Sequence, residues 1–159
     1  EDGYVCWINL DGLIIEKYEL IKTKSFKNEH FFIKDKITSI LEWIKYQAEL
    51  KNKYLWGGTL GPNFDCSGLI QNIMQMNNID FPRDTDMQED FCTRSLLRKN
   101  LKAGDLVFWK GHVALMTEKK KIIHANAYHM KTQEESLVTA ETRIFKTNGK
   151  VRKYARIIS

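Results

Sequence analysis

The sequence has few of the residues that cross-link a chain or anchor it in a membrane. Its 159 residues include only three cysteines, Cys6, Cys66 and Cys92, and they form no Cys-x-x-Cys pair. An odd number without paired spacing argues against a disulfide framework and against a zinc knuckle. No apolar run reaches the ~18 residues that a membrane span needs. We therefore expect neither a disulfide-stabilised scaffold nor a membrane-spanning segment.

The chain carries a small net positive charge. Its net charge is +5 and its pI is about 9.0, with the basic residues scattered along the sequence. Such a balance suits an anionic partner, for example a carboxylate-rich peptide or a cell-wall polymer. The one tight basic run, at 119–121, is interpreted as a solvated turn, so nucleic acid is not the expected partner. Length and composition fit a single globular domain with a sizeable core.

The most informative stretch is the boundary between a glycine-rich loop and an apolar, helix-patterned run that begins at Cys66. A helix start concentrates unpaired N–H groups and the positive end of the helix dipole. A thiol there is expected to have its thiolate, the nucleophilic form, stabilised. Cys6 lies in a strand-like apolar stretch, and Cys92 has no base near it in the sequence. The pattern therefore points to a cysteine hydrolase with Cys66 as its nucleophile.

The periodicity predicts helices in the first part of the chain and an antiparallel sheet in the second. A strand over 4–10 and a strand with a linker over 13–33 come first. We expect helices over 35–49, with Asp35 as N-cap, and over 66–76, followed by a short helix in 83–91. Strands are predicted at 105–109, 112–116 and 121–124, then at 136–146 and 151–158 around an Asn148-Gly149 hairpin turn. This order is α+β.

Two histidines have the placement that a catalytic base requires. His112 opens one predicted strand and His124 ends the next, so an antiparallel pairing around 118–120 would bring them together. One imidazole could then fix the tautomer of the other, which is the logic of a catalytic triad. His30 and His129 are interpreted as structural residues. A metal site built from Cys66, His112 and His124 is the competing interpretation, because an open catalytic zinc needs only three ligands.

Five blocks of this sequence, in order, resemble the NlpC/P60 family of cysteine peptidases. They are Tyr54-Leu55-Trp56-Gly57-Gly58, Asp65-Cys66-Ser67-Gly68-Leu69, Gly104-Asp105-Leu106-Val107-Phe108, His112-Val113-Ala114 and Ile123-His124-Ala125. The resemblance implies a papain-like α+β fold over 34–159 and hydrolysis of peptidoglycan stem peptides without cofactor or metal. It makes Cys66 the nucleophile, His112 the base and His124 the orienting residue. Tyr54 matches a family tyrosine near the oxyanion side of the cleft.

Two further segments, 81–88 and 124–130, look like the subgroup that cleaves between D-γ-glutamate and the diamino acid. In that subgroup an SH3-like domain precedes the peptidase, and 1–33 is predicted to be the remnant of such a domain plus a linker. Asp65 is expected to hold the substrate's free ammonium, with a hydrogen bond from Ser67. Arg83 is expected to pair with the α-carboxylate of D-glutamate.

The sequence leaves other functions open. A non-catalytic cell-wall-binding module with the same fold is one alternative, and another papain-like amidase or acyltransferase is a second. Three unpaired cysteines favour the cytoplasm, where an enzyme recycling free wall peptides would work, over the periplasm or secretion. Nothing in the sequence indicates an oligomeric state.

Overall fold

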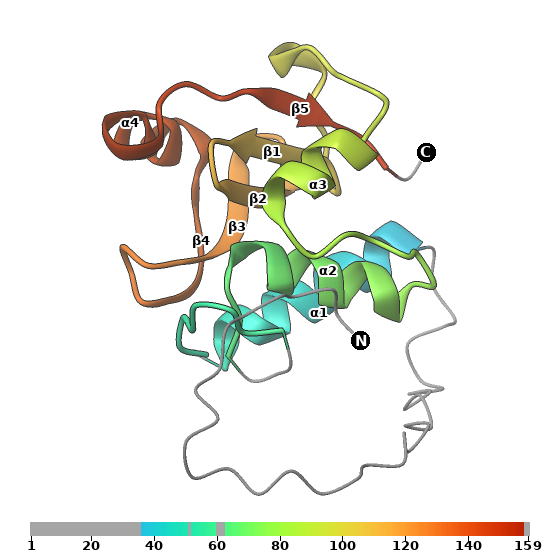
Figure 1. Ribbon diagram of the computed structural model, residues 1–159. Helices are drawn as coiled ribbons and strands as arrows, with labels where there is room; N and C mark the ends of the chain where they lie inside the picture. The colour runs from blue at the N-terminus through green and yellow to red at the C-terminus, as the bar shows by residue number, and fades with distance from the viewer. Residues whose placement is uncertain (1–35, 51, 60–62, 158–159) are drawn as a thin grey trace, which may run out of the picture.

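The computed structural model describes residues 36–50, 52–59 and 63–157 (Figure 1). The predicted SH3-like remnant at 1–33, the strand at 4–10, Cys6 and the Asp35 cap lie outside these residues. Within them, helices precede a five-stranded sheet and one further helix follows its fourth strand. The predicted α+β class, with N-terminal helices packed on an antiparallel sheet, is confirmed.

The sheet has the strand order β4-β3-β2-β1-β5, and every neighbouring pair is antiparallel. Its strands are β1 (Leu106–Trp109), β2 (His112–Glu118), β3 (Lys121–Asn126), β4 (Lys131–Ser136) and β5 (Lys153–Ala155). The first three match the predicted strands closely. Their side chains alternate between two separate apolar clusters, one on each face of the sheet. Both faces must therefore be covered.

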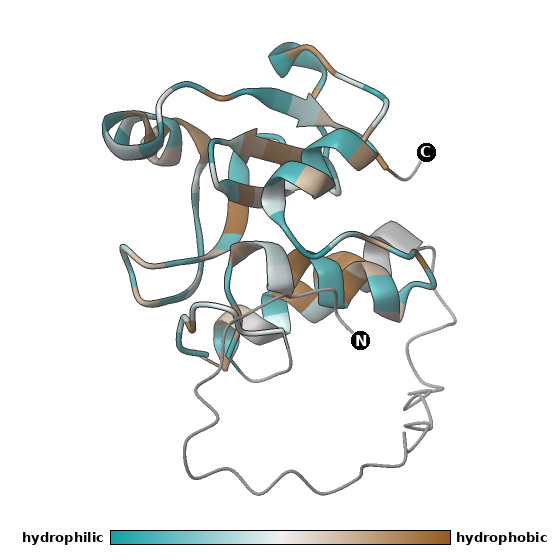
Figure 2. Cartoon of the chain, in the orientation of Figure 1, coloured by the Kyte–Doolittle hydropathy of each residue, from teal (hydrophilic) through white to brown (hydrophobic). Residues whose placement is uncertain are grey.

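Helices α1 (Lys36–Glu49) and α2 (Cys66–Met76) cover one face. Ile40 and Ile44 of α1 are fully buried, as their four-residue spacing predicts for one face of a helix. Eight of the eleven residues of α2 are buried, which makes α2 the central helix of this layer. Figure 2 shows the apolar residues concentrated in α2 and in the central strands. The start of α2 is thus held rigidly against the sheet.

Helix α4 (Leu137–Asn148) covers the opposite face, so the predicted strand at 136–146 is wrong. The segment is rich in Val, Thr and Ile, which favour strands. Its buried residues, however, are Leu137, Ala140 and Ile144, whose spacing follows a helix. The predicted hairpin turn is also wrong, because Gly149 ends α4 with a φ of 82°.

Strand β4, at an edge of the sheet, was not predicted. Its sequence, Lys-Thr-Gln-Glu-Glu-Ser, is polar, and Thr132 is its one buried residue. An edge strand with one packed position carries no apolar alternation for sequence reasoning to detect. It is nevertheless paired with β3 along its whole length. The predicted short helix within 83–91 is confirmed as α3 (Thr85–Phe91), which begins after Asp84.

Candidate active site

Cys66 is the first residue of α2, directly after its N-cap, Asp65. The Asp65 carboxylate accepts the backbone N–H of Gly68 at 2.7 Å and that of Gly57 at 2.9 Å. The loop and the helix start also touch through their backbones, since a Cβ on Gly68 would lie 2.1 Å from the Gly58 carbonyl oxygen. Glycine is therefore required at this contact, and the two glycine-containing blocks together fix the position of the thiol.

A buried ion pair completes this support. The Arg83 guanidinium donates to both carboxylate oxygens of Asp65, at 3.1 and 2.6 Å, and to the Ser67 hydroxyl at 2.8 Å. The side chain of Arg83 is 1 % exposed and that of Asp65 is 10 % exposed. Arg83 thus lies behind Asp65 rather than on the cleft surface. Its predicted pairing with a substrate carboxylate, and the predicted ammonium contact of Asp65 and Ser67, stay predictions.

The two histidines meet as the predicted hairpin requires. Nε2 of His112 lies 2.8 Å from Nδ1 of His124. Strand alternation places both rings on the face of the sheet that α4 covers. The hydrogen bond uses one ring nitrogen of each histidine. The same contact disfavours the metal alternative, because these two nitrogens face each other rather than a common ligand position.

Glu135 of β4 extends this hydrogen-bonded chain and fixes its direction. Its carboxylate lies 2.8 Å from Nε2 of His124, so that nitrogen carries the proton and donates it. Nδ1 of His124 is then the acceptor, and Nε2 of His112 is the donor. By elimination, Nδ1 of neutral His112 is left with a free lone pair. That nitrogen is the one available to take a proton from a thiol.

Arg143 of α4 holds Glu135 from the other side. Its guanidinium donates to the same carboxylate oxygen that His124 contacts, and it lies 4.5 Å from the ring centroid of Tyr128. His129 approaches that oxygen at 3.7 Å. The negative charge of Glu135 is therefore balanced without protonation of His124.

Burial controls the protonation of the reacting pair. It raises the pKa of the Cys66 thiol, and nearby Asp65 adds to the rise. Burial also lowers the pKa of His112 well below 6.5, and His124 and Arg143 lower it further. Both directions favour a neutral thiol beside a neutral imidazole. Burial thus outweighs the predicted stabilisation of the thiolate by the helix start.

Burial and the Glu135 contact act in opposite directions on His124. Burial lowers the pKa of His124, whereas the hydrogen bond from its ring to Glu135 raises it, and the net shift is downward. Burial alone would raise the pKa of Glu135, but its contacts with His124 and Arg143 lower it overall. These pKa directions favour an ionised Glu135 next to a neutral His124.

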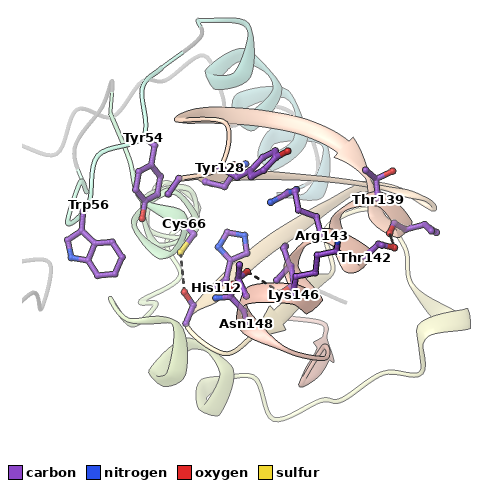
Figure 3. Close-up of a pocket in the computed structure, with 16 residues that line it drawn as sticks. Tyr54, Trp56, Cys66, His112, Tyr128, Thr139, Thr142, Arg143, Lys146 and Asn148 are labelled. Carbon is purple, nitrogen blue, oxygen red and sulfur yellow. Dashed lines mark hydrogen bonds between the residues drawn. The ribbon is translucent and has the colours of Figure 1, made fainter.

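Cys66 and His112 line one cleft, with Tyr54 and Trp56 on its loop side (Figure 3). Burial and the nearby Cys66 raise the pKa of Tyr54 to about 12, which keeps its hydroxyl protonated and able to donate. The sulfur of Cys66 lies 3.9 Å from the Thr85 hydroxyl and 4.0 Å from the Gly111 carbonyl oxygen. These neighbours leave the thiol at the floor of the cleft.

Sequence reasoning missed Glu135, Arg143 and Thr85. Glu135 lies in a strand that was not predicted, and Arg143 lies in a helix that was wrongly predicted as a strand, so no spacing argument could connect them to His124. Thr85 lies within the predicted short helix in 83–91, and that position gave no sign of proximity to Cys66. The segment 81–88, which resembles the subgroup, also has a structural role. Its Gln88 donates hydrogen bonds to the carbonyl oxygens of Ser67 and Pro82.

The residues that the structure describes also bear on a membrane span and on a metal site. None of their helices is long and apolar enough to cross a membrane. Within the same part of the chain, no group of three or more His, Cys, Asp or Glu side chains is arranged to hold a metal ion.

A cysteine at a helix start, facing a histidine relay across an α+β cleft, is the arrangement of a thiol hydrolase. The chain belongs to the NlpC/P60 family, whose model matches residues 51–147.

The chain is similar to several bacterial peptidases. It is 31 % identical over 98 residues to dipeptidyl-peptidase 6 of Lysinibacillus sphaericus, covering 62 % of this chain and 34 % of that protein. It is 38 % identical over 80 residues to the gamma-D-glutamyl-L-lysine dipeptidyl-peptidase of Bacillus subtilis, covering 45 % and 27 %. The chain thus spans between about a quarter and a third of the length of these relatives.

The fold is shared with solved structures. NlpC2 from Trichomonas vaginalis superposes with a TM-score of 0.65 at 20 % identity, over 79 % of this chain and 49 % of that one. At this identity the match concerns the fold alone.

Proposed function

We propose that this protein is a cysteine endopeptidase that hydrolyses the bond between D-γ-glutamate and the diamino acid of peptidoglycan stem peptides. The observation that carries the proposal is the relay from Glu135 through His124 to His112, beside Cys66 in one cleft. The relative from Bacillus subtilis, named for a gamma-D-glutamyl-L-lysine peptidase activity, supports this choice of bond.

In the proposed reaction His112 takes the thiol proton as Cys66 attacks the γ-carbonyl carbon. Charge then develops on the carbonyl oxygen, which accepts hydrogen bonds from the Cys66 backbone N–H and the Tyr54 hydroxyl in this proposal. His112 next gives its proton to the leaving amine as the C–N bond breaks and the thioester remains. A water molecule, deprotonated by the same ring, hydrolyses the thioester. Glu135 and His124 position the ring throughout and do not touch the substrate.

The test uses the tripeptide L-Ala-γ-D-Glu-L-Lys and detection of released L-Ala-γ-D-Glu by mass spectrometry. Cys66→Ala should abolish release while circular dichroism stays that of the native fold. Cys92→Ala is the matched control, because Cys92 is also a buried free cysteine but does not line the cleft. Unchanged turnover in Cys66→Ala would refute the mechanism. A wild-type protein that binds the peptide without cleaving it would instead favour the wall-binding alternative.

The finer context of the enzyme is part of the same proposal. We infer that residues 1–33 end an SH3-like domain that narrows the cleft and that the enzyme recycles free stem peptides in the cytoplasm. The support is the subgroup-like sequence of 81–88 and 124–130, together with Cys66 and Cys92, which are free thiols. Cell fractionation of the full-length gene product, with an antibody to this domain, tests the compartment.

A further inference from the structure

The cleft extends to both sides of Cys66, and its two ends are lined by different elements. A cavity of about 1010 Å³ runs from Cys66 and His112 to α4. A smaller one, of about 420 Å³, runs from Cys66 past Ser67 to the start of α3. Figure 3 shows α4 side chains, including Arg143 and Lys146, on the His112 side of the thiol.

The proposed function determines which fragment of the substrate binds at each end of the cleft, and the inference below rests on that function. His112 delivers its proton to the leaving amine, so the leaving fragment must lie on the His112 side of Cys66. That side is the larger cavity, along α4. The acyl fragment, which carries the free amine of L-alanine, then occupies the smaller cavity.

The charges of the two cavities differ in sign. The described lining of the larger cavity includes the cations Arg143 and Lys146 and no carboxylate. The smaller cavity is lined by three carboxylates and two cations, namely Asp65, Asp84, Asp86, Lys110 and Arg152. The cleft is thus basic where the leaving fragment binds and acidic where the acyl fragment binds. A substrate with a carboxylate at the leaving end and an ammonium at the other end matches this pattern.

The free positive charge of the larger cavity belongs to Lys146. The guanidinium of Arg143 already faces Glu135, so most of its charge is balanced inside the protein. Lys146 is exposed in the last turn of α4, and its ammonium has no ion-pair partner in the described part of the chain. Two donors in the cavity wall, Nδ2 of Asn126 and Nε of Arg143, also have no hydrogen-bond partner among the described residues.

We propose that the α4 side of the cleft is a carboxylate-binding subsite, in which Lys146 pairs with a free carboxylate of the leaving fragment. This carboxylate is either the C-terminal α-carboxylate or the side-chain carboxylate of diaminopimelate. Because the pair is exposed, it changes the affinity about two- to fivefold and weakens as salt rises.

The experiment compares three peptides with the full chain. They are L-Ala-γ-D-Glu-L-Lys, its C-terminal carboxamide, and L-Ala-γ-D-Glu-meso-diaminopimelate with the C-terminal carboxyl amidated and the side-chain carboxyl free. Two of these peptides keep a free carboxylate on the leaving residue. The wild-type enzyme should show a lower KM for one or both of them than for the lysine carboxamide, at similar kcat. The peptide that gains identifies which carboxylate is bound.

Lys146→Met should raise the KM of the favoured peptide to that of the lysine carboxamide and leave kcat in place. Lys150→Met is the matched control, because Lys150 carries the same charge close to the end of α4 but does not line this cavity. Equal KM values for all three wild-type reactions, or an unchanged preference in Lys146→Met, would overturn the subsite alone. Failure of the wild-type protein to cleave any peptide would overturn the proposed function and the subsite with it.

Discussion

The cleft has two walls, one at the start of α2 and one formed by β4 and α4, and different kinds of contact hold the site residues on each. On the α2 wall the thiol is fixed by backbone contacts between glycines and by a buried pair, Asp65 and Arg83, that balances its own charge. On the wall formed by β4 and α4, half-buried charges and hydrogen bonds hold the imidazoles, and Lys146 remains open to the cleft. Close backbone packing is local and leaves a recognisable motif. Long side chains that reach between elements leave no motif.

The largest expected effect separates the buried pair from an exposed one. Arg83→Met leaves the Asp65 carboxylate buried without its partner, which should lower the free energy of unfolding by about 3–5 kcal/mol. The bidentate pair of Arg98 and Glu141 provides the control, because Arg98 is half exposed. Arg98→Met should cost about 1 kcal/mol or less. Urea denaturation followed by circular dichroism measures both, and equal losses would show that burial does not distinguish the two pairs.

A smaller effect is expected on the opposite wall, and on catalysis rather than stability. Glu135→Gln removes the charge that keeps the proton on Nε2 of His124, so part of the enzyme should adopt the unproductive tautomer. We expect kcat to fall about tenfold or more. Nitrogen NMR shifts of the two histidines should change with it, which a merely structural role for Glu135 would not produce.

The neighbouring residue on β4 provides the matched control for this change. Glu134 accepts from the Thr117 hydroxyl at 2.6 Å and does not contact His124. Glu134→Gln should leave both kcat and the histidine shifts as in the wild type. If both variants behave alike, the strand rather than the relay is the cause.

The smallest effect concerns the pH dependence of the wild-type enzyme and tests both walls together. In the proposed mechanism the reactive form needs a neutral His112 and a protonated Cys66. Burial lowers the pKa of His112 below 6.5, so kcat/KM should decline on the acid side only at pH values below 6.5. Burial raises the pKa of Cys66 above 9.0, so the alkaline limb should lie above that value. A plateau between the two limbs is the expected profile. An alkaline limb centred well below pH 9.0 would instead indicate a preformed thiolate–imidazolium pair, which loses activity when its imidazolium is deprotonated.

The sequence predicted the parts of the fold whose signals are local. Helical spacing located α1 and α2, short separators located β1 to β3, and the hairpin between β2 and β3 correctly brought His112 to His124. It failed for β4, which is a polar edge strand, and for α4, where β-branched residues concealed a helical period. The sequence also did not predict the charge state of the thiol. Burial outweighs the effect of the helix start, and burial depends on how the helices pack on the sheet.

The amino-acid sequence by itself determined the position of the thiol, because the glycines and the aspartate that hold it are chain neighbours and act through the backbone. It also determined which two imidazoles could meet. Only the tertiary structure decided how their protons are arranged and which charges line the α4 end of the cleft. Those properties depend on Glu135, Arg143 and Lys146, whose side chains reach the site through space from elements that follow it in the chain.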